Sequence, residues 1–297
     1  MALIRSWMFV PGSDSKKIGK VQQLPADVII FDLEDAVALA EKESARKKVK
    51  EALGIETNKN YVVRVNSTDT PYFVDDVKEI VGEGLMGIML PKSESREQIL
   101  LLDDLLGKLE KEQGLKREIE VIPLIESALG VCRADEIASA SARVKCLAFG
   151  SVDYTLDIDA ELTKEGFELL YARSRLVNVS RAAGIQSPID AVYTDIHDLE
   201  GLRKETTFIK QMGFQGKLVV YPKQIGVVNE VFMPSREDIE NAQMIVSAFE
   251  KSVKEGLGAV QVNGKMIDLP VVERAKRIVE KAEWLAGTTK SETETSV

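Results

Sequence analysis

Two acidic residues, Glu126 and Asp153, each follow a short apolar run of the kind that forms a buried strand. Glu126 comes directly after Val121-Ile122-Pro123-Leu124-Ile125, and Asp153 follows Phe149-Gly150-Ser151-Val152. Two carboxylates and several water molecules suit a hard octahedral cation such as Mg²⁺, with Mn²⁺ as a substitute. The alternative for both residues is a helix-capping role, although Ser127 would cap better than Glu126. We therefore predict Glu126 and Asp153 as ligands of a divalent metal ion.

A denser acidic cluster follows another apolar run, in Asp32-Leu33-Glu34-Asp35. Three negative charges within four positions repel one another unless a cation or an arginine lies nearby. Because side chains alternate along a strand, Asp32 and Glu34 share a face and could both point at the water shell of the metal. The alternative is a solvated loop that caps the next helix.

Arg64 is a charged residue inside an otherwise apolar run, Tyr61-Val62-Val63-Arg64-Val65. A buried arginine normally has an anionic partner, and its planar guanidinium matches a substrate carboxylate through two parallel hydrogen bonds. A structural ion pair with the cluster around Asp32 is the alternative. Lys92 follows a further apolar run and is either an ordinary surface lysine or a contact for an anionic group such as a phosphate.

The composition restricts the chemistry that these residues can serve. A net charge of −9 over 297 residues argues against a general binder of nucleic acid or membrane surfaces, but not against a small anionic ligand. His197 is the only histidine, so zinc sites built on several histidines are excluded. Proton transfer then falls to carboxylates, lysines or tyrosines.

Other features of the sequence bear on location. No apolar run approaches the length of a membrane span, so we expect no transmembrane helix. The first residues also lack the apolar stretch and cleavage site of a secretory signal. Cys132 and Cys146 are expected to be buried, inert thiols in a reducing compartment. Together these features predict a cytoplasmic protein.

The residues above are positioned by short apolar runs that alternate with longer segments of helical period. Runs rich in Val and Ile and bounded by Gly, Pro or Asp are typical of strands buried on both faces. Eight such strands with helices between them favour a closed (β/α)₈ TIM barrel over an open sheet. The predicted strands span residues 7–10, 28–33, 61–65, 87–90, 120–125, 146–149, 185–189 and 217–221, and helices are predicted for instance over 41–53, 94–113, 171–183 and 199–212.

The barrel is predicted to occupy residues 1–233, and a C-terminal extension of helices and a hairpin occupies 234–297. A helix is expected over 236–255, followed by a hairpin around Asn263-Gly264, which is a favoured two-residue turn. A last helix is expected over 270–285, and we predict that the polar tail, residues 287–297, is disordered.

A barrel of this kind places its chemistry at the carboxyl ends of the strands. Acidic residues follow the second, fifth, sixth and seventh predicted strands, and Arg64 lies near the end of the third. Structural needs alone would not put so many charges at one end of buried strands, so we expect a functional site at this rim. The six acids expected there are Asp32, Glu34, Asp35, Glu126, Asp153 and Asp190.

Six motifs in order make the chain resemble the citrate lyase β-subunit family, within the HpcH/HpaI aldolase group that includes malyl-CoA and citramalyl-CoA lyases. They run over nearly the whole chain, and none is diagnostic alone. The motifs are Arg5-Ser6-Trp7-Met8-Phe9-Val10-Pro11-Gly12, Phe31-Asp32-Leu33-Glu34-Asp35-Ala36-Val37, Val63-Arg64-Val65-Asn66, Ile125-Glu126, Phe149-Gly150-Ser151-Val152-Asp153-Tyr154, and Gly216-Lys217 through Pro222-Lys223-Gln224-Ile225.

The resemblance implies a Mg²⁺-dependent lyase that cleaves or forms a β-hydroxyacyl-CoA thioester, giving acetyl-CoA and a small 2-oxo acid. It implies that Glu126 and Asp153 bind the metal and that Arg64 holds the oxo acid and its enolate. It also implies that Asp268, on the extension, reaches into a neighbouring subunit and moves a proton, so that the protein is a homotrimer or a hexamer.

We predict Glu34 as a further catalytic residue and Asp32, Asp35 and Lys92 as further substrate-binding residues. One departure from the family is Tyr221 in Val220-Tyr221-Pro222, where the family commonly has His. Tyrosine does not titrate near neutral pH, so any acid–base role of that histidine is in doubt here.

Three alternatives stay open. The chain could be a metal-dependent aldolase of 2-oxo acids that does not use CoA, or the β subunit of a citrate lyase complex that acts on an acyl-carrier-protein thioester. It could also be a barrel that binds a metabolite without catalysis.

Overall fold

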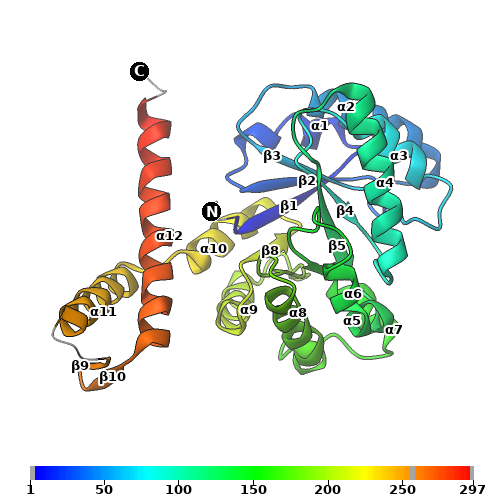
Figure 1. The fold of residues 1–297 in the computed structure, drawn as a ribbon. Helices are drawn as coiled ribbons and strands as arrows, with labels where there is room; N and C mark the ends of the chain where they lie inside the picture. The colour runs from blue at the N-terminus through cyan, green and yellow to red at the C-terminus, as the bar shows by residue number, and fades with distance from the viewer. Residues whose placement is uncertain (1–3, 255–257, 295–297) are drawn as a thin grey trace. The chain divides into compact units, whose positions relative to one another are not determined.

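The computed structural model describes residues 4–254 and 258–294. The chain forms two compact units, which divide after Phe232. In the first unit, eight parallel strands pair in sequence order, and β8 pairs with β1 to close the barrel (Figure 1). The predicted TIM barrel is therefore confirmed. The strands are β1 (Ser6–Pro11), β2 (Val28–Asp32), β3 (Asn60–Arg64), β4 (Gly87–Leu90), β5 (Glu120–Ile125), β6 (Ala148–Phe149), β7 (Ile189–Asp190) and β8 (Gly216–Val219).

Helices connect the strands, and the four named in the sequence prediction, now α2, α4, α8 and α9, are present to within two residues at each end. Helix α10 is not among the predicted helices. Pro222 begins α10, a position where the missing N–H of proline costs no hydrogen bond. The helices are α1 (Ser15–Ile18), α2 (Lys42–Leu53), α3 (Phe73–Ile80), α4 (Arg96–Gln113), α5 (Ala128–Cys132), α6 (Ala134–Ala138), α7 (Ser151–Asp157), α8 (Leu170–Ala182), α9 (Leu199–Met212) and α10 (Pro222–Phe232), with short 3₁₀ turns at Val21–Gln23, Leu39–Glu41 and Phe167–Leu169.

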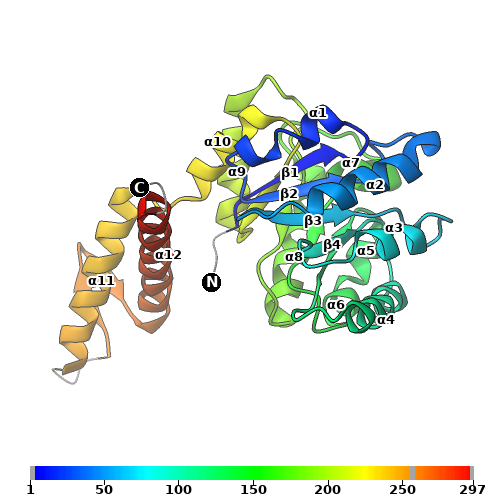
Figure 2. The ribbon, with the colours of Figure 1, turned by 90° about the horizontal axis from the view of Figure 1, so that it is seen from above.

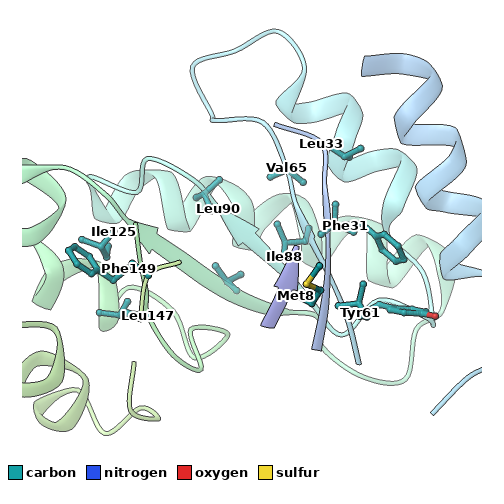
Figure 3. Close-up of a cluster of buried hydrophobic side chains, with 14 of the residues drawn as sticks. Met8, Phe31, Leu33, Tyr61, Val65, Ile88, Leu90, Ile125, Leu147 and Phe149 are labelled. Carbon is teal, nitrogen blue, oxygen red and sulfur yellow. The ribbon is translucent and has the colours of Figure 1, made fainter. Parts of the chain in front are cut away.

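The alternation of side chains along each strand separates two buried apolar clusters. The inner cluster contains strand residues such as Trp7, Ile30 and Leu124 and no helix residue, so it fills the barrel interior. The outer cluster combines the opposite strand faces with helix residues and lies between the barrel and its helices. Figure 3 shows part of this outer cluster, including Phe31 and Tyr61, whose ring centroids lie 5.1 Å apart.

Strand β7 differs from its prediction, because it covers Ile189–Asp190 rather than residues 185–189. Pro188 has no N–H to give to a strand ladder, and regular pairing begins after it. Ile189 belongs to the inner cluster, so the next residue, Asp190, points outward toward the helices. Its carboxylate binds Arg173 of α8 (Nε to Oδ1, 2.8 Å) and Lys217 of β8 (Nζ to Oδ2, 2.6 Å). The prediction that Asp190 lies at the rim is therefore wrong.

The second unit consists of α11 (Arg236–Lys254), the antiparallel strands β9 (Val260–Val262) and β10 (Lys265–Ile267), and α12 (Leu269–Glu294). Helices α11 and α12 lie side by side in both ribbon views (Figure 2). The predicted hairpin is present, and Asn263 and Gly264 have the positive φ values, 49° and 76°, that its two-residue turn requires. Among the described residues, none of the helices has the length and apolarity needed to cross a membrane.

Helix α12 is longer than predicted. It continues through residues 287–294, where the sequence predicts disorder, while residues 295–297 lie outside the described residues. Extending an existing helix costs far less than starting one, so a polar segment can continue a helix that it would not nucleate.

Candidate active site

The inner faces of β2, β3 and β5 direct three charged residues toward the barrel axis at the carboxyl ends of the strands. Val28 and Ile30 are inner-cluster residues, so Asp32 follows on the same face of β2. Arg64 pairs directly with Asp32 across the ladder and follows the inner residue Val62. On β5, Leu124 is an inner residue, and the side chain two positions later is that of Glu126. This common face is the physical basis of the site.

Arg64 and Asp32 form a bidentate ion pair. Nε of Arg64 donates to Oδ1 of Asp32 at 2.8 Å, and Nη2 donates to Oδ2 at 2.7 Å. The remaining nitrogen, Nη1, lies 3.1 Å from Glu34 and 3.4 Å from Asp35. Burial opposes the charge of the guanidinium, but Asp32 and the other two acids outweigh it and hold the pKa of Arg64 above its ordinary value. The ion pair that the sequence left as an alternative is thus present.

Asp32 also organises the turn that follows β2. Its Oδ1 accepts from the backbone N–H of Glu34 at 2.9 Å, and its Oδ2 accepts from that of Ala36 at 3.2 Å. Because Arg64 donates to the same two oxygens, each oxygen of the Asp32 carboxylate accepts two hydrogen bonds from the protein itself. Asp32 therefore acts on the site by orienting Arg64 and the turn that carries Glu34.

Glu34 is only 6% exposed, yet within the described residues its carboxylate oxygens accept no well-aligned hydrogen bond. Arg64 Nη1 and Lys92 Nζ approach it at 3.1 Å each as ion-pair partners. Burial raises the pKa of Glu34, which Arg64 and Lys92 counteract and Asp35 reinforces. A buried carboxylate with unused lone pairs beside cations is suited to exchange protons or to accept from a ligand.

Glu126 is also deeply buried, at 4% exposure. Its Oε1 accepts from the backbone N–H of Lys92 at 2.8 Å. On the other side it packs against Gly150, where an added Cβ would lie 2.6 Å from Oε2 of Glu126. Burial, together with the charges of Glu34 and Asp153, raises the pKa of Glu126 to about 8. A cation at this carboxylate would therefore remove a large electrostatic cost.

Asp153 lies in the first turn of α7, half-buried. The capping alternative is wrong for this residue, because Gly150 occupies the N-cap position and no side chain caps the helix. Asp153 is near enough to Glu126 for its charge to raise the pKa of that carboxyl. The structure thus brings together the two predicted metal ligands.

The donor set fits a Mg²⁺ ion that keeps several non-protein ligands. Within residues 4–254 and 258–294, no group of three or more His, Cys, Asp or Glu side chains is arranged to hold a metal. Two carboxylates, one of them buried with a raised pKa, leave the remaining octahedral positions to water and to oxygens of a substrate. Such an open coordination sphere is what a catalytic metal requires.

A cavity of about 760 Å³ opens beside Arg64. Its walls are mainly apolar, with two lysines of the α1 region and the acids of the β2 turn at its edge. A second cavity, of about 740 Å³, lies at the amino ends of β3 and β4 and contains none of the acids described above. The first cavity is the one that can serve the site; it is lined by Met8, Phe9, Val10, Pro11, Lys17, Lys20, Leu24, Asp32, Asp35, Ala36, Arg64, Val192, Val220, Tyr221 and Pro222.

Gln224 was not singled out from the sequence. It is fully buried in α10, and its Oε1 accepts from the backbone N–H groups of Val220 and Tyr221 at 3.1 and 3.2 Å. Its Nε2 donates to the carbonyl of Tyr193 at 2.8 Å. Gln224 therefore fixes the cavity wall that carries Tyr221. A polar residue at an apolar position of the helical pattern was the available signal.

His197 is exposed just before α9 and does not line the cavity. Asp268 belongs to the second unit, where its carbonyl accepts from the N–H groups of Val271 and Val272 at the start of α12. The predicted role of Asp268 in a neighbouring subunit stays a prediction.

The family model described as HpcH/HpaI aldolase/citrate lyase matches residues 5–222, and one described as a C–C bond lyase of the TIM-barrel fold matches residues 161–286. The chain is 43% identical to the citrate lyase subunit beta of Leuconostoc mesenteroides subsp. cremoris, over 94% of this chain and 93% of that protein. It is 33% identical to the L-malyl-CoA/beta-methylmalyl-CoA lyase of Rhodobacter capsulatus, over 95% of each.

Among solved structures, the chain is similar to the protein CitE from Mycobacterium tuberculosis in complex with magnesium, acetoacetate and coenzyme A. The TM-score is 0.80 at 29% identity, over 95% of this chain and 99% of that one. The resemblance drawn from the six sequence motifs is confirmed.

Proposed function

Because the chain belongs to the HpcH/HpaI aldolase/citrate lyase family, we propose that it is a Mg²⁺-dependent carbon–carbon lyase of the aldolase type, which cleaves or forms a β-hydroxyacyl-CoA thioester. The products of cleavage are acetyl-CoA and a 2-oxo acid. The observation that carries the proposal is the grouping of Glu126, Asp153 and Arg64 at one end of the barrel. Relatives that act on such thioesters, and a similar structure that contains magnesium and coenzyme A, support it.

The residues of this chain divide the reaction between them. Glu126 and Asp153 hold the metal, which supplies Lewis acidity toward the carbonyl oxygen of the 2-oxo acid. Arg64, held in one orientation by Asp32, directs Nη1 at the position where negative charge develops on the departing enolate or on a substrate carboxylate. Because this orientation exists before substrate binds, no reorganisation is needed when the charge appears.

Cleavage requires one proton to leave the β-hydroxyl group and another to reach the acetyl carbon. As the hydroxyl proton leaves, a carbonyl forms, the carbon–carbon bond breaks, and its electron pair moves into the thioester enolate. Glu34, buried and without well-aligned donors among the described residues, is placed to take part in proton transfer at the site. Asp268 of a neighbouring subunit is our candidate to deliver the proton to the enolate carbon.

The apolar cavity beside Arg64 suits the thioester arm of the substrate. Lys17 and Lys20 at its edge can meet a phosphate of the carrier. Asp35, which lines the cavity, and Lys92, which is 3.1 Å from Glu34, contact the oxo-acid end. We assign the protein to the cytoplasm, which its free thiols support, and to a homotrimer or hexamer in which the extension packs on a neighbouring subunit.

A second candidate function is supported by the 43% identity to a citrate lyase subunit. In this case the chain works in a complex, and the thioester is carried by an acyl-carrier protein rather than by CoA. The site chemistry is the same for both carriers, because the carbon–carbon bond lies at the same distance from the sulfur.

The test is to incubate the protein with Mg²⁺ and with malyl-, citramalyl- and citryl-CoA and to measure release of the 2-oxo acid. Glu126→Gln should abolish release, whereas Glu120→Gln, at the other end of β5, should retain it. Release from an acyl-carrier thioester but not from the CoA thioesters would favour the second candidate. Release that continues without Mg²⁺ would refute the metal-dependent mechanism.

A further inference from the structure

Lys42 is a buried lysine whose ammonium forms its hydrogen bonds with backbone carbonyls. It is the first residue of α2 and is 5% exposed. Its ammonium donates to the carbonyl oxygens of Leu33 and Glu34, at 2.7 Å in both cases. Burial lowers the pKa of Lys42, while the acids around it, Asp32 first, counteract this effect. Burying an ammonium group costs free energy, so a buried lysine at this turn suggests a specific role.

The two carbonyls belong to the turn that carries Glu34. The N–H of Glu34 is bound by Asp32, and its carbonyl is bound by Lys42, so the backbone of this residue is held on both sides. The side-chain amide of Asn66 adds a second donor to the Leu33 carbonyl at 3.0 Å. Asn66 is itself anchored by Asp76 at 2.6 Å. The turn is therefore fixed by a connected set of buried polar groups.

The fixed backbone determines where the Glu34 carboxylate lies. It is buried between Arg64 and Lys92, 3.1 Å from a nitrogen of each. Without the ammonium of Lys42, two buried carbonyl oxygens would lose a charged donor, and the turn could relax toward solvent. Glu34 would then leave its place between the two cations.

We propose that Lys42 is a positioning residue for the reaction at this site: it holds the turn after β2 so that Glu34 stays between Arg64 and Lys92. The inference rests on the proposed lyase function, because it assigns Lys42 a part in that reaction. Lys42 does not itself line the cavity, and its ammonium donates to the carbonyls of Leu33 and Glu34, so its effect is exerted through the turn that carries Glu34.

The chain contains a matched control on the same helix. Lys50 of α2 also donates from Nζ to a backbone carbonyl, that of Val81, at 2.7 Å. This bond lies two turns away and supports the end of α3, not the turn that carries Glu34. A purely structural lysine should behave like Lys50, whereas a positioning lysine should affect turnover.

The experiment compares Lys42→Met, Lys42→Arg, Lys50→Met, Glu34→Gln and the double variant Lys42→Met/Glu34→Gln. We expect Lys42→Met to lower kcat by roughly tenfold or more while KM for the thioester changes by less than about twofold. Lys42→Arg, which keeps charged donors, should recover part of the loss. Lys50→Met should keep the wild-type kcat. In the Glu34→Gln background, Lys42→Met should lower kcat little further, since both changes remove the positioned carboxylate of Glu34.

Equal kcat values for Lys42→Met and Lys50→Met, or fully additive losses in the double variant, would overturn the inference. If Lys42→Met does not fold, Lys42→Gln, which keeps one donor, replaces it under the same criteria. Hydrogen–deuterium exchange gives a readout without activity: amides of residues 33–37 should exchange faster in Lys42→Met and not in Lys50→Met. A wild type that cleaves no thioester would refute the proposed function, while unchanged exchange in Lys42→Met would refute the role of Lys42.

Discussion

The backbone N–H of Lys92, two residues after β4, donates to Oε1 of Glu126 at 2.8 Å and so orients the acid that follows β5. Lys92 makes this bond from a left-handed conformation, with φ of 49°. Its side chain turns to Glu34, 3.1 Å away. Lys92 thus connects Glu126, the proposed metal ligand, to Glu34 of the β2 turn, through its backbone N–H on one side and its side chain on the other.

The two roles of Lys92 can be separated by comparing Lys92→Gly with Lys92→Ala. Both remove the ammonium, so we expect the same fall in kcat. The left-handed conformation destabilises the alanine variant by about 1–2 kcal/mol. The greater entropy of the unfolded chain destabilises the glycine variant by only about 0.5–1 kcal/mol. The glycine variant should therefore be more stable by up to about 1.5 kcal/mol in urea unfolding. A more stable alanine variant would contradict the role assigned to the backbone.

Mg²⁺ binding should release a proton. The pKa of Glu126 is raised to about 8, so its carboxyl is protonated in the metal-free protein at neutral pH and must ionise to bind the cation. Calorimetry in buffers of different ionisation enthalpy should show roughly one proton released per metal at pH 6.5 and almost none at pH 9.5. Glu120→Gln should leave this release unchanged. A release that does not depend on pH would show that Glu126 is not the group that titrates.

The same shift has a defined sign for stability. Between the ordinary pKa of 4.5 and the raised value of about 8, the folded metal-free protein binds more protons than the unfolded chain does. Its free energy of unfolding should therefore fall as the pH rises through this interval and level off above it. Glu126→Gln should make the decline shallower, as measured by urea unfolding in the presence of a chelator.

The barrel and most of its rim could be predicted from the sequence, because strands buried on both faces appear as apolar runs. Glu126 and Arg64 can be recognised because Glu126 is a charged residue directly after such a run and Arg64 is a charged residue within one. The errors arose where orientation depends on one residue of register. Ile189 points into the barrel, so Asp190, the next residue, faces the helices, because neighbouring side chains of a strand point to opposite faces.

Contacts between elements distant in the sequence could not be predicted. The pairing of Asp32 with Arg64 depends on the register between β2 and β3, and the bond from Lys92 to Glu126 depends on a backbone N–H that no residue pattern marks. Lys42 looks like any lysine at a helix start. Its burial is determined by the packing of α2 against the β2 turn, a property of the tertiary structure.

The two thiols should differ sharply in reactivity. Cys132 is exposed, so the prediction that both cysteines are buried is wrong for this residue. Cys146 belongs to the inner cluster, and burial raises the pKa of its thiol to about 12. A chromogenic disulfide reagent at pH 8 should therefore label one thiol per native chain and two after denaturation. Cys132→Ser should abolish the native reaction, and rapid labelling of two native thiols would contradict the placement of Cys146.

Asp190→Ala should destabilise the protein without altering the chemistry of the site. The carboxylate is fully buried against Arg173 and Lys217, and removing it leaves two buried cations that share Glu205 as an ion-pair partner. Breaking a buried ion pair in this way costs about 3–5 kcal/mol. Asp135→Ala, which removes an exposed pair with Arg175, should cost about 1 kcal/mol or less. Urea unfolding measures both changes. The folded Asp190→Ala protein should keep its kcat, because Asp190 faces the helices. A large loss of kcat in a fully folded variant would contradict this placement and indicate that Asp190 acts at the rim.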